Sequence, residues 1–116
     1  MSEIRQGQVY WLDLGPATGS APAERHPCVV VQNDVFNRSA IATTVVCLIT
    51  SNLSRGKAPG NVLLERGEAN LPKACVVNVS QILTIDKAEL VEFVGKLRVE
   101  AVRAVRDGLH LLFERL

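Results

Sequence analysis

The chain has 116 residues, 47% of them hydrophobic, and a formal net charge of +1 at neutral pH. This length and composition predict one globular domain, residues 1–116, with a core of its own, and the charge balance does not indicate a strongly basic nucleic-acid binder. No apolar run approaches the roughly 20 residues needed to cross a bilayer. The first residues lack the pattern of a signal peptide, so we expect no membrane association and a cytoplasmic location.

The first half of the chain predicts three strands. Residues 8–14 alternate between apolar and polar types, which places Val9, Trp11 and Leu14 on one buried side. Residues 27–32 are apolar on both faces, as in a central strand. Residues 41–49 are rich in β-branched side chains, which also favour a strand.

The second half predicts shorter strands and then a helix. Residues 61–64, 74–78, 80–85 and 93–97 are expected strands, and residues 86–90 form a single helical turn capped by Asp86. From residue 98 the period becomes helical, and Gly108 interrupts this helix at a cost of about 1 kcal/mol relative to alanine. Its apolar stripe is Val99, Val102, Val105, Leu109, Leu112 and Leu116. Short strands at this spacing favour a small barrel or sandwich.

Three cysteines lie far apart, each in a valine-rich segment: Cys28, Cys47 and Cys75. We expect reduced thiols that pack as small core hydrophobes. Paired Cys or His residues at metal-ligand spacing are absent from the sequence. The sequence therefore predicts neither a metal site nor a cofactor.

Small and turn-forming residues between positions 15 and 24 lead to Arg25 and His26, at the start of the strand at 27–32. A guanidinium can bind phosphate oxygens with two parallel hydrogen bonds, and an imidazole exchanges protons near neutral pH. Such a pair suits a phosphate-directed site. An ordinary solvated loop would have the same composition, so these residues alone leave both interpretations open.

Several segments in order carry a family resemblance: residues 5–14 (RQGQVYWLDL), 25–34 (RHPCVVVQND), 49–52 (ITSN) and 76–87 (VVNVSQILTIDK), with Gly15-Pro16 and Gly19-Ser20 between the first two. At this spacing the chain resembles the MazF/PemK family of toxin endoribonucleases from bacterial toxin–antitoxin pairs. It departs from the family pattern at Ala21, Pro22 and Glu24, and His26 stands before proline where arginine is commonest.

The resemblance implies a mainly β fold, an SH3-like and partly open small barrel with a C-terminal helix. It also implies a homodimer, a MazE-like antitoxin as partner, and metal-independent cleavage of single-stranded RNA without a cofactor. The expected products carry a 2′,3′-cyclic phosphate and a 5′-hydroxyl.

The resemblance assigns the catalytic roles to Arg25 and Thr50, with His26 as a helper or substitute. Which of Arg25 and His26 is essential stays open. Candidate contacts to RNA are Ser20, Phe36, Asn37, Ser51, Asn52 and Gln81. Phe36 is the preferred platform for base stacking, whereas Trp11 is expected in the core.

Two alternatives differ in target. A toxin of the same fold could poison DNA gyrase by binding it, and a non-catalytic SH3-like module could bind nucleic acid without cutting it. The second predicts RNA binding without new cyclic-phosphate ends. The sequence specifies neither the cleavage site, nor the antitoxin, nor the class of RNA.

Overall fold

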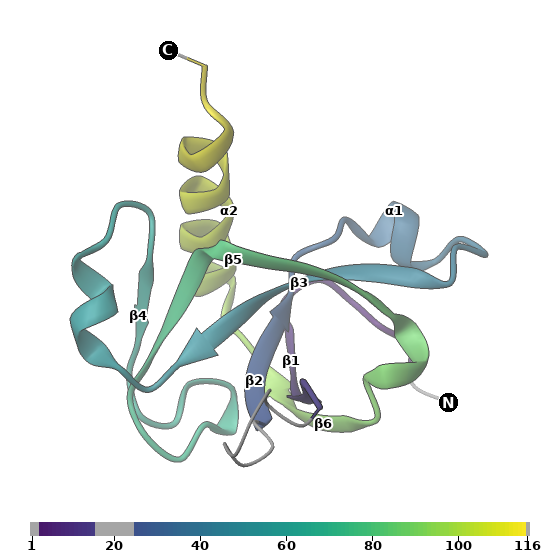
Figure 1. Ribbon diagram of the computed structural model, residues 1–116, viewed down its shortest axis with the longest axis horizontal. Coiled ribbons are helices and arrows are strands. Elements are labelled where there is room, and N and C mark those ends of the chain that lie inside the picture. Colours follow the sequence, from purple (N-terminus) through teal and green to yellow (C-terminus); the bar gives the residue numbers. More distant parts are fainter. Residues whose placement is uncertain (1–2, 16–24, 116) are drawn as a thin grey trace.

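The computed structural model describes residues 3–15 and 25–115. Six antiparallel strands form one sheet in the order β4-β5-β3-β2-β1-β6 (Figure 1). The strands are β1 (Gln8–Asp13), β2 (Arg25–Val30), β3 (Thr43–Thr50), β4 (Val62–Leu64), β5 (Cys75–Asp86) and β6 (Glu92–Lys96). The α-helices are α1 (Asp34–Asn37) and α2 (Val99–Phe113), and short 3₁₀ turns cover Leu53–Lys57, Glu68–Asn70 and Lys87–Glu89.

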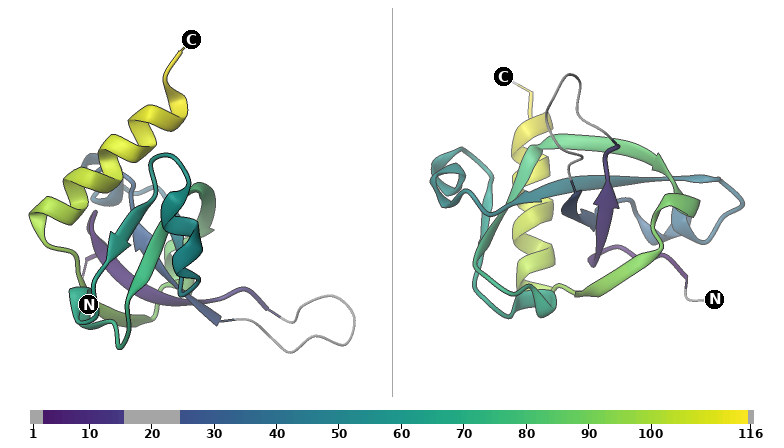
Figure 2. Two further views of the ribbon diagram at one scale, coloured as in Figure 1. Left: turned by 90° about the vertical axis from the view of Figure 1, so that its left-hand side faces the viewer. Right: turned by 60° about the horizontal axis from the view of Figure 1, so that its bottom comes forward.

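The sheet curls into a partial barrel with α2 against one side (Figure 2). Alternate residues of a strand point to opposite faces, so each long strand contributes side chains to two cores. Val9 and Val29 enter the core that contacts α2, whereas Tyr10 and Cys28 enter the other core. The expected mainly β fold, a partly open barrel with a C-terminal helix, is confirmed.

The first strand is buried on both sides rather than on one. Tyr10 and Leu12 are 3% and 1% exposed, because the curled sheet encloses a second core on their face. Leu14, expected on the buried side, lies past the end of β1 and is 41% exposed. Trp11 is only half-buried, so its expected place in the core is wrong.

The segments 74–78 and 80–85, expected as two strands, form the single 12-residue strand β5. Its pairing with β3 shifts register between the pairs Cys47–Ile82 and Ile49–Val77, where β5 carries extra residues. Such a bulge bends a strand without ending it, and β5 is visibly bent in Figure 1.

Helix α2 was predicted, and its apolar stripe is correct in part, because Val102 and Leu109 pack against the core together with the buried Val105. Ala101, Val105 and Gly108 are buried, while Val99 and Leu112 are 62% and 43% exposed. Leu116 lies outside the described residues. Gly108 lies close to the turn that precedes β4, since a Cβ atom on Gly60 would be 3.1 Å from the Gly108 Cα.

The short helix α1 was not predicted from the sequence. Asn33 caps it by accepting a hydrogen bond from the backbone N–H of Val35 at 2.8 Å. The predicted turn after Asp86 is confirmed, and Glu89 accepts a hydrogen bond from the Asp86 N–H at 3.0 Å. Within the described ranges, neither α-helix is both long and apolar enough to cross a membrane.

The three thiols are free and buried, as expected. Burial raises the pKa of Cys28 to about 12 and that of Cys47 to about 11. At these values the reactive thiolate forms are almost absent at neutral pH. The cysteines therefore act as small hydrophobic side chains.

Candidate active site

A hollow of about 240 Å³ opens where β2 begins and β3 ends. We call it the strand-end hollow. Its polar lining comes from Arg25, His26, Thr50, Ser51 and Lys73. Its apolar lining includes Trp11, Pro27, Ile49, Leu71 and Pro72.

Strand pairing brings these side chains together from distant parts of the sequence. In the β2–β3 register Cys28 lies opposite Leu48, so continuing the register by two residues brings His26 opposite Thr50. In the β1–β2 register Trp11 lies opposite Pro27, one diagonal step from Arg25. Because side chains alternate, Arg25 shares the face of Trp11, and His26 shares the face of Thr50. Residues of both faces line the strand-end hollow.

Two neighbours hold the guanidinium of Arg25. Its carbon lies 4.8 Å from the centroid of the Trp11 ring, a cation–π contact. Its Nη2 forms an ion pair with the carboxylate of Glu92, at the start of β6. The side chains of Arg25 and Glu92 are about half exposed, so the cation remains accessible to an anion.

The hydroxyl of Thr50 lies in a turn that ends β3. Its oxygen accepts a hydrogen bond from the Asn52 N–H at 3.1 Å, which leaves the hydroxyl proton for donation to another group. Asn52 in turn accepts hydrogen bonds from the backbone N–H and the hydroxyl of Ser54, at 3.2 and 2.6 Å. These contacts fix the backbone around Thr50 and Ser51.

The other expected RNA contacts do not line the strand-end hollow. Phe36 is 55% exposed on α1. Asn37 is only 7% exposed, and its amide bonds to Gln32, Asp34 and Thr44, which indicates a structural role. Gln81 is exposed at the bend of β5, where it accepts a hydrogen bond from Asn78 at 3.1 Å. Ser20 lies outside the described residues.

Sequence analysis missed Lys73 and Glu92 and misplaced Trp11. Lys73 follows the turn-forming pair Leu71-Pro72 directly before a strand, which is a sequence signal for a side chain at a strand end. Glu92 carries no comparable signal, because its meeting with Arg25 depends on the β1–β6 pairing.

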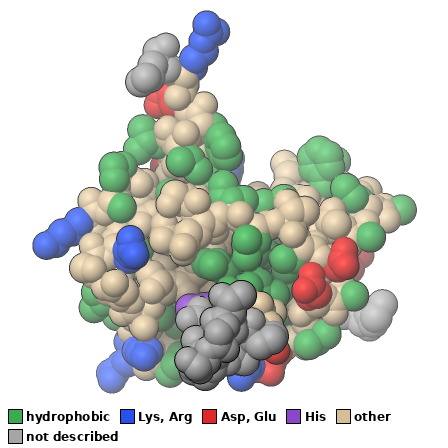
Figure 3. All heavy atoms as spheres, viewed as in Figure 1, with side chains coloured by type: hydrophobic (Ala, Val, Ile, Leu, Met, Phe, Trp, Pro, Cys, Tyr) green, Lys and Arg blue, Asp and Glu red, His purple; other side chains and the backbone are tan. Residues whose placement is uncertain are grey.

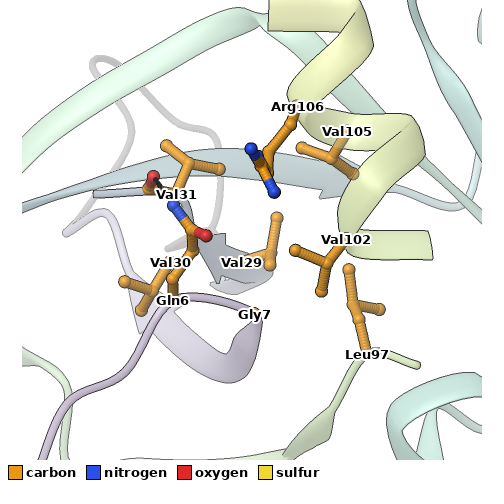
Figure 4. A pocket seen from close by; sticks show the side chains of 9 residues that line it. All are labelled: Gln6, Gly7, Val29, Val30, Val31, Leu97, Val102, Val105 and Arg106. Carbon is orange, nitrogen blue, oxygen red and sulfur yellow. Dashed lines mark hydrogen bonds between the residues drawn. The ribbon is translucent and has the colours of Figure 1, made fainter. Parts of the chain in front are cut away.

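A second, smaller cavity lies between α2 and β2 (Figure 4). Valines 29, 102 and 105 form much of its wall, and Gln6 beside it donates a hydrogen bond to the Val31 carbonyl at 2.8 Å. At about 10 Å³ it holds at most one water molecule. This volume is too small for a small-molecule ligand.

Comparison with known proteins identifies the family. Residues 5–113 match the model of the PemK-like, MazF-like toxin of type II toxin–antitoxin systems. The chain is 40% identical to the endoribonuclease MazF6 of Mycobacterium tuberculosis and to the endoribonuclease MazF2 of Mycobacterium bovis. Each alignment covers 96% of this chain and 97% of the relative.

Solved structures agree with this assignment. A mycobacterial endoribonuclease in complex with its cognate antitoxin is 25% identical, with a TM-score of 0.76 over 97% of this chain and 99% of that chain. The fold is also that of MazF in a MazE–MazF crystal structure from Deinococcus radiodurans, 20% identical, with a TM-score of 0.78 over 97% and 96% of the two chains. The chain therefore belongs to the family of PemK-like, MazF-like toxins of type II toxin–antitoxin systems.

Proposed function

We propose that this protein is an endoribonuclease that cleaves single-stranded RNA without a metal ion, leaving a 2′,3′-cyclic phosphate and a 5′-hydroxyl. The observation that carries the proposal is the convergence of a guanidinium, an imidazole and a hydroxyl on one accessible hollow, from Arg25, His26 and Thr50. The endoribonuclease names of the relatives with 40% identity support the same activity.

The reaction is an intramolecular transesterification, in which the phosphate exchanges its ester bond to the 5′-oxygen for one to the 2′-oxygen. The 2′-oxygen attacks the adjacent phosphorus and gives its proton to a base, while the bond from phosphorus to the 5′-oxygen breaks and that oxygen gains a proton. The five-coordinate phosphorus species carries extra negative charge, so the reaction needs a cation as well as a proton carrier.

The described side chains can divide these tasks. Arg25 binds the phosphate oxygens through its guanidinium and stabilises the developing charge. His26 acts as the proton carrier, and the Thr50 hydroxyl donates a hydrogen bond to the scissile phosphate. Comparing the RNA cleavage rates of Arg25→Ala and His26→Ala decides which of the two side chains is essential.

Lys73 adds a second cation to the same hollow and is proposed to contact a neighbouring phosphate. The backbone amide of Ser51 follows Thr50 and is proposed to contact RNA, whereas the Asn52 N–H already donates to Thr50, which leaves the Asn52 side chain as the candidate contact. Ser20 and Gln81 remain candidates for contacts to phosphates or base edges.

We further propose that the protein acts in the cytoplasm as a homodimer and is inhibited by a MazE-like antitoxin. Apolar side chains gather on the surface between α2 and α1 (Figure 3), and Leu112 and Phe113 of α2 are 43% and 73% exposed. A cluster of exposed apolar side chains is typical of a protein interface. We expect an acidic segment of the antitoxin to occupy the strand-end hollow by mimicking the RNA polyanion.

The test incubates wild-type protein with a mixed single-stranded RNA in EDTA and maps the new ends. We expect cuts at a common short sequence with cyclic-phosphate termini, and loss of these cuts in Arg25→Ala. Arg55→Ala removes an exposed cation from the Leu53–Lys57 turn and is the matched control, expected to cleave normally. Circular dichroism verifies that each variant folds.

Other outcomes would replace the proposal. RNA binding without new ends would favour a non-catalytic module, whereas inhibition of gyrase without RNA cleavage would favour the gyrase-directed alternative. Cleavage that requires an added metal ion would contradict the proposed chemistry.

A further inference from the structure

Glu92 contacts the proposed catalytic arginine from outside the strand-end hollow. It begins β6, lies opposite Trp11 in the β1–β6 register, and forms an ion pair with Nη2 of Arg25. Arg25 and Trp11 line the hollow, whereas Glu92 does not. The carboxylate therefore contacts the guanidinium without occupying the space available to a phosphate.

The two contacts on Arg25 are complementary. The guanidinium carbon lies over the Trp11 ring, 4.8 Å from its centroid, and the Glu92 carboxylate pairs with Nη2. Two contacts with different partners restrict the orientation of the guanidinium. Because a guanidinium has five N–H donors, the contact at Nη2 leaves other donors for a substrate anion.

Orientation matters because an arginine side chain is long and flexible. When the guanidinium is ordered before the substrate arrives, less conformational freedom is lost on reaching the transition state, and its charge is already in place. The exposed ion pair contributes little to folding stability by itself. Its effect is therefore expected in the rate of reaction rather than in the stability of the fold.

We propose that Glu92 is a positioning residue that, together with Trp11, orients the guanidinium of Arg25 toward the scissile phosphate. This inference rests on the proposed function of Arg25. The opposite role, a carboxylate that competes with phosphate for the arginine, predicts a different kinetic result and is an outcome of the test.

The first measurement needs no RNA. Trp11 is the single tryptophan of the chain, so its fluorescence reports directly on the neighbouring cation. In Glu92→Ala we expect the Trp11 emission or its quenching by acrylamide to change. Arg25→Ala should produce the same change, and the variant with both substitutions should show no larger one. Glu100→Ala removes an exposed carboxylate from the first turn of α2 and is the control, expected to match wild type.

The second measurement separates kcat from KM for RNA cleavage. We expect Glu92→Ala to lower kcat about tenfold without raising KM, Glu92→Asp to retain most of the rate, and Glu100→Ala to change it less than about twofold. The difference between wild type and Glu92→Ala should shrink at high salt, where the exposed pair is screened. If Glu92→Ala does not fold, the isosteric Glu92→Gln takes its place.

Three results would overturn the inference: unchanged Trp11 fluorescence in the Glu92 variant, an unchanged kcat, or a lower KM at full kcat, which is the signature of competition. A wild-type protein that leaves RNA intact would instead contradict the proposed function. The fluorescence comparison would then still decide whether Glu92 orders Arg25.

Discussion

Replacing Gly108 by alanine tests whether tertiary contact overrides helix propensity in α2. Glycine in a helix interior costs about 1 kcal/mol relative to alanine, so local propensity alone predicts that Gly108→Ala stabilises the protein. The structure predicts the opposite. A Cβ atom at position 108 would lie 2.1 Å from the carbonyl oxygen of Gly60 and 3.1 Å from a methyl carbon of Val79.

The magnitude follows from what would have to move. Real Cβ atoms essentially never come within 3.0 Å of such a neighbour, and the obstacle here is backbone rather than the end of a flexible side chain. Overpacking of a well-packed site costs about 1–3 kcal/mol, and a backbone obstacle favours the upper end. After subtracting the propensity gain, we expect a net destabilisation of about 2 kcal/mol.

The assay is urea denaturation at one fixed protein concentration, because self-association would add to the apparent stability. The control compares Arg103→Ala with Arg103→Gly at an exposed position of the same helix. The difference in their unfolding free energies measures the helix propensity of alanine relative to glycine without a steric clash. A Gly108→Ala protein as stable as wild type, or more stable, would refute the argument from close approach.

Three further predictions concern single side chains. Thr50→Ala should lower kcat/KM about 100-fold or more while Thr50→Ser retains most of the activity, and an unchanged rate in Thr50→Ala would assign the residue to structure alone. Burial raises the pKa of Glu68, but hydrogen bonds from the Arg98 N–H and Nε at 2.8 and 2.7 Å outweigh it and hold the pKa below its usual value. The carboxylate therefore stabilises the fold above the ordinary glutamate pKa of about 4.3, and this contribution is lost as pH falls through the lowered value. In denaturation at several pH values, the stability difference between wild type and Glu68→Gln should be largest above about pH 5 and disappear in acid. Finally, Cys28 and Cys47 should react with iodoacetamide at about pH 8 only after denaturation, because burial raises their pKa values to about 12 and about 11; mass spectrometry of native protein that shows rapid labelling would contradict this.

Part of the candidate site was predictable because it depends on strand ends. Arg25 and His26 precede an apolar strand and Thr50 ends another, so their positions follow from local patterns in the sequence. Phe36 was chosen for stacking because it lies near basic residues in the sequence. The structure instead brings Trp11 to the strand-end hollow, through a pairing with β2 that no local pattern reveals.

The sequence by itself determined the chemical types and the local elements: β-branched runs that become strands, a helical period that becomes α2, and cysteines that pack as hydrophobes. It did so because these properties depend on side-chain preferences within a few residues. Only the tertiary structure decided which strand ends meet, why Gly108 is required, and that Glu92 lies against Arg25. Those outcomes depend on sheet register and curvature, which are set by contacts between residues far apart in the chain.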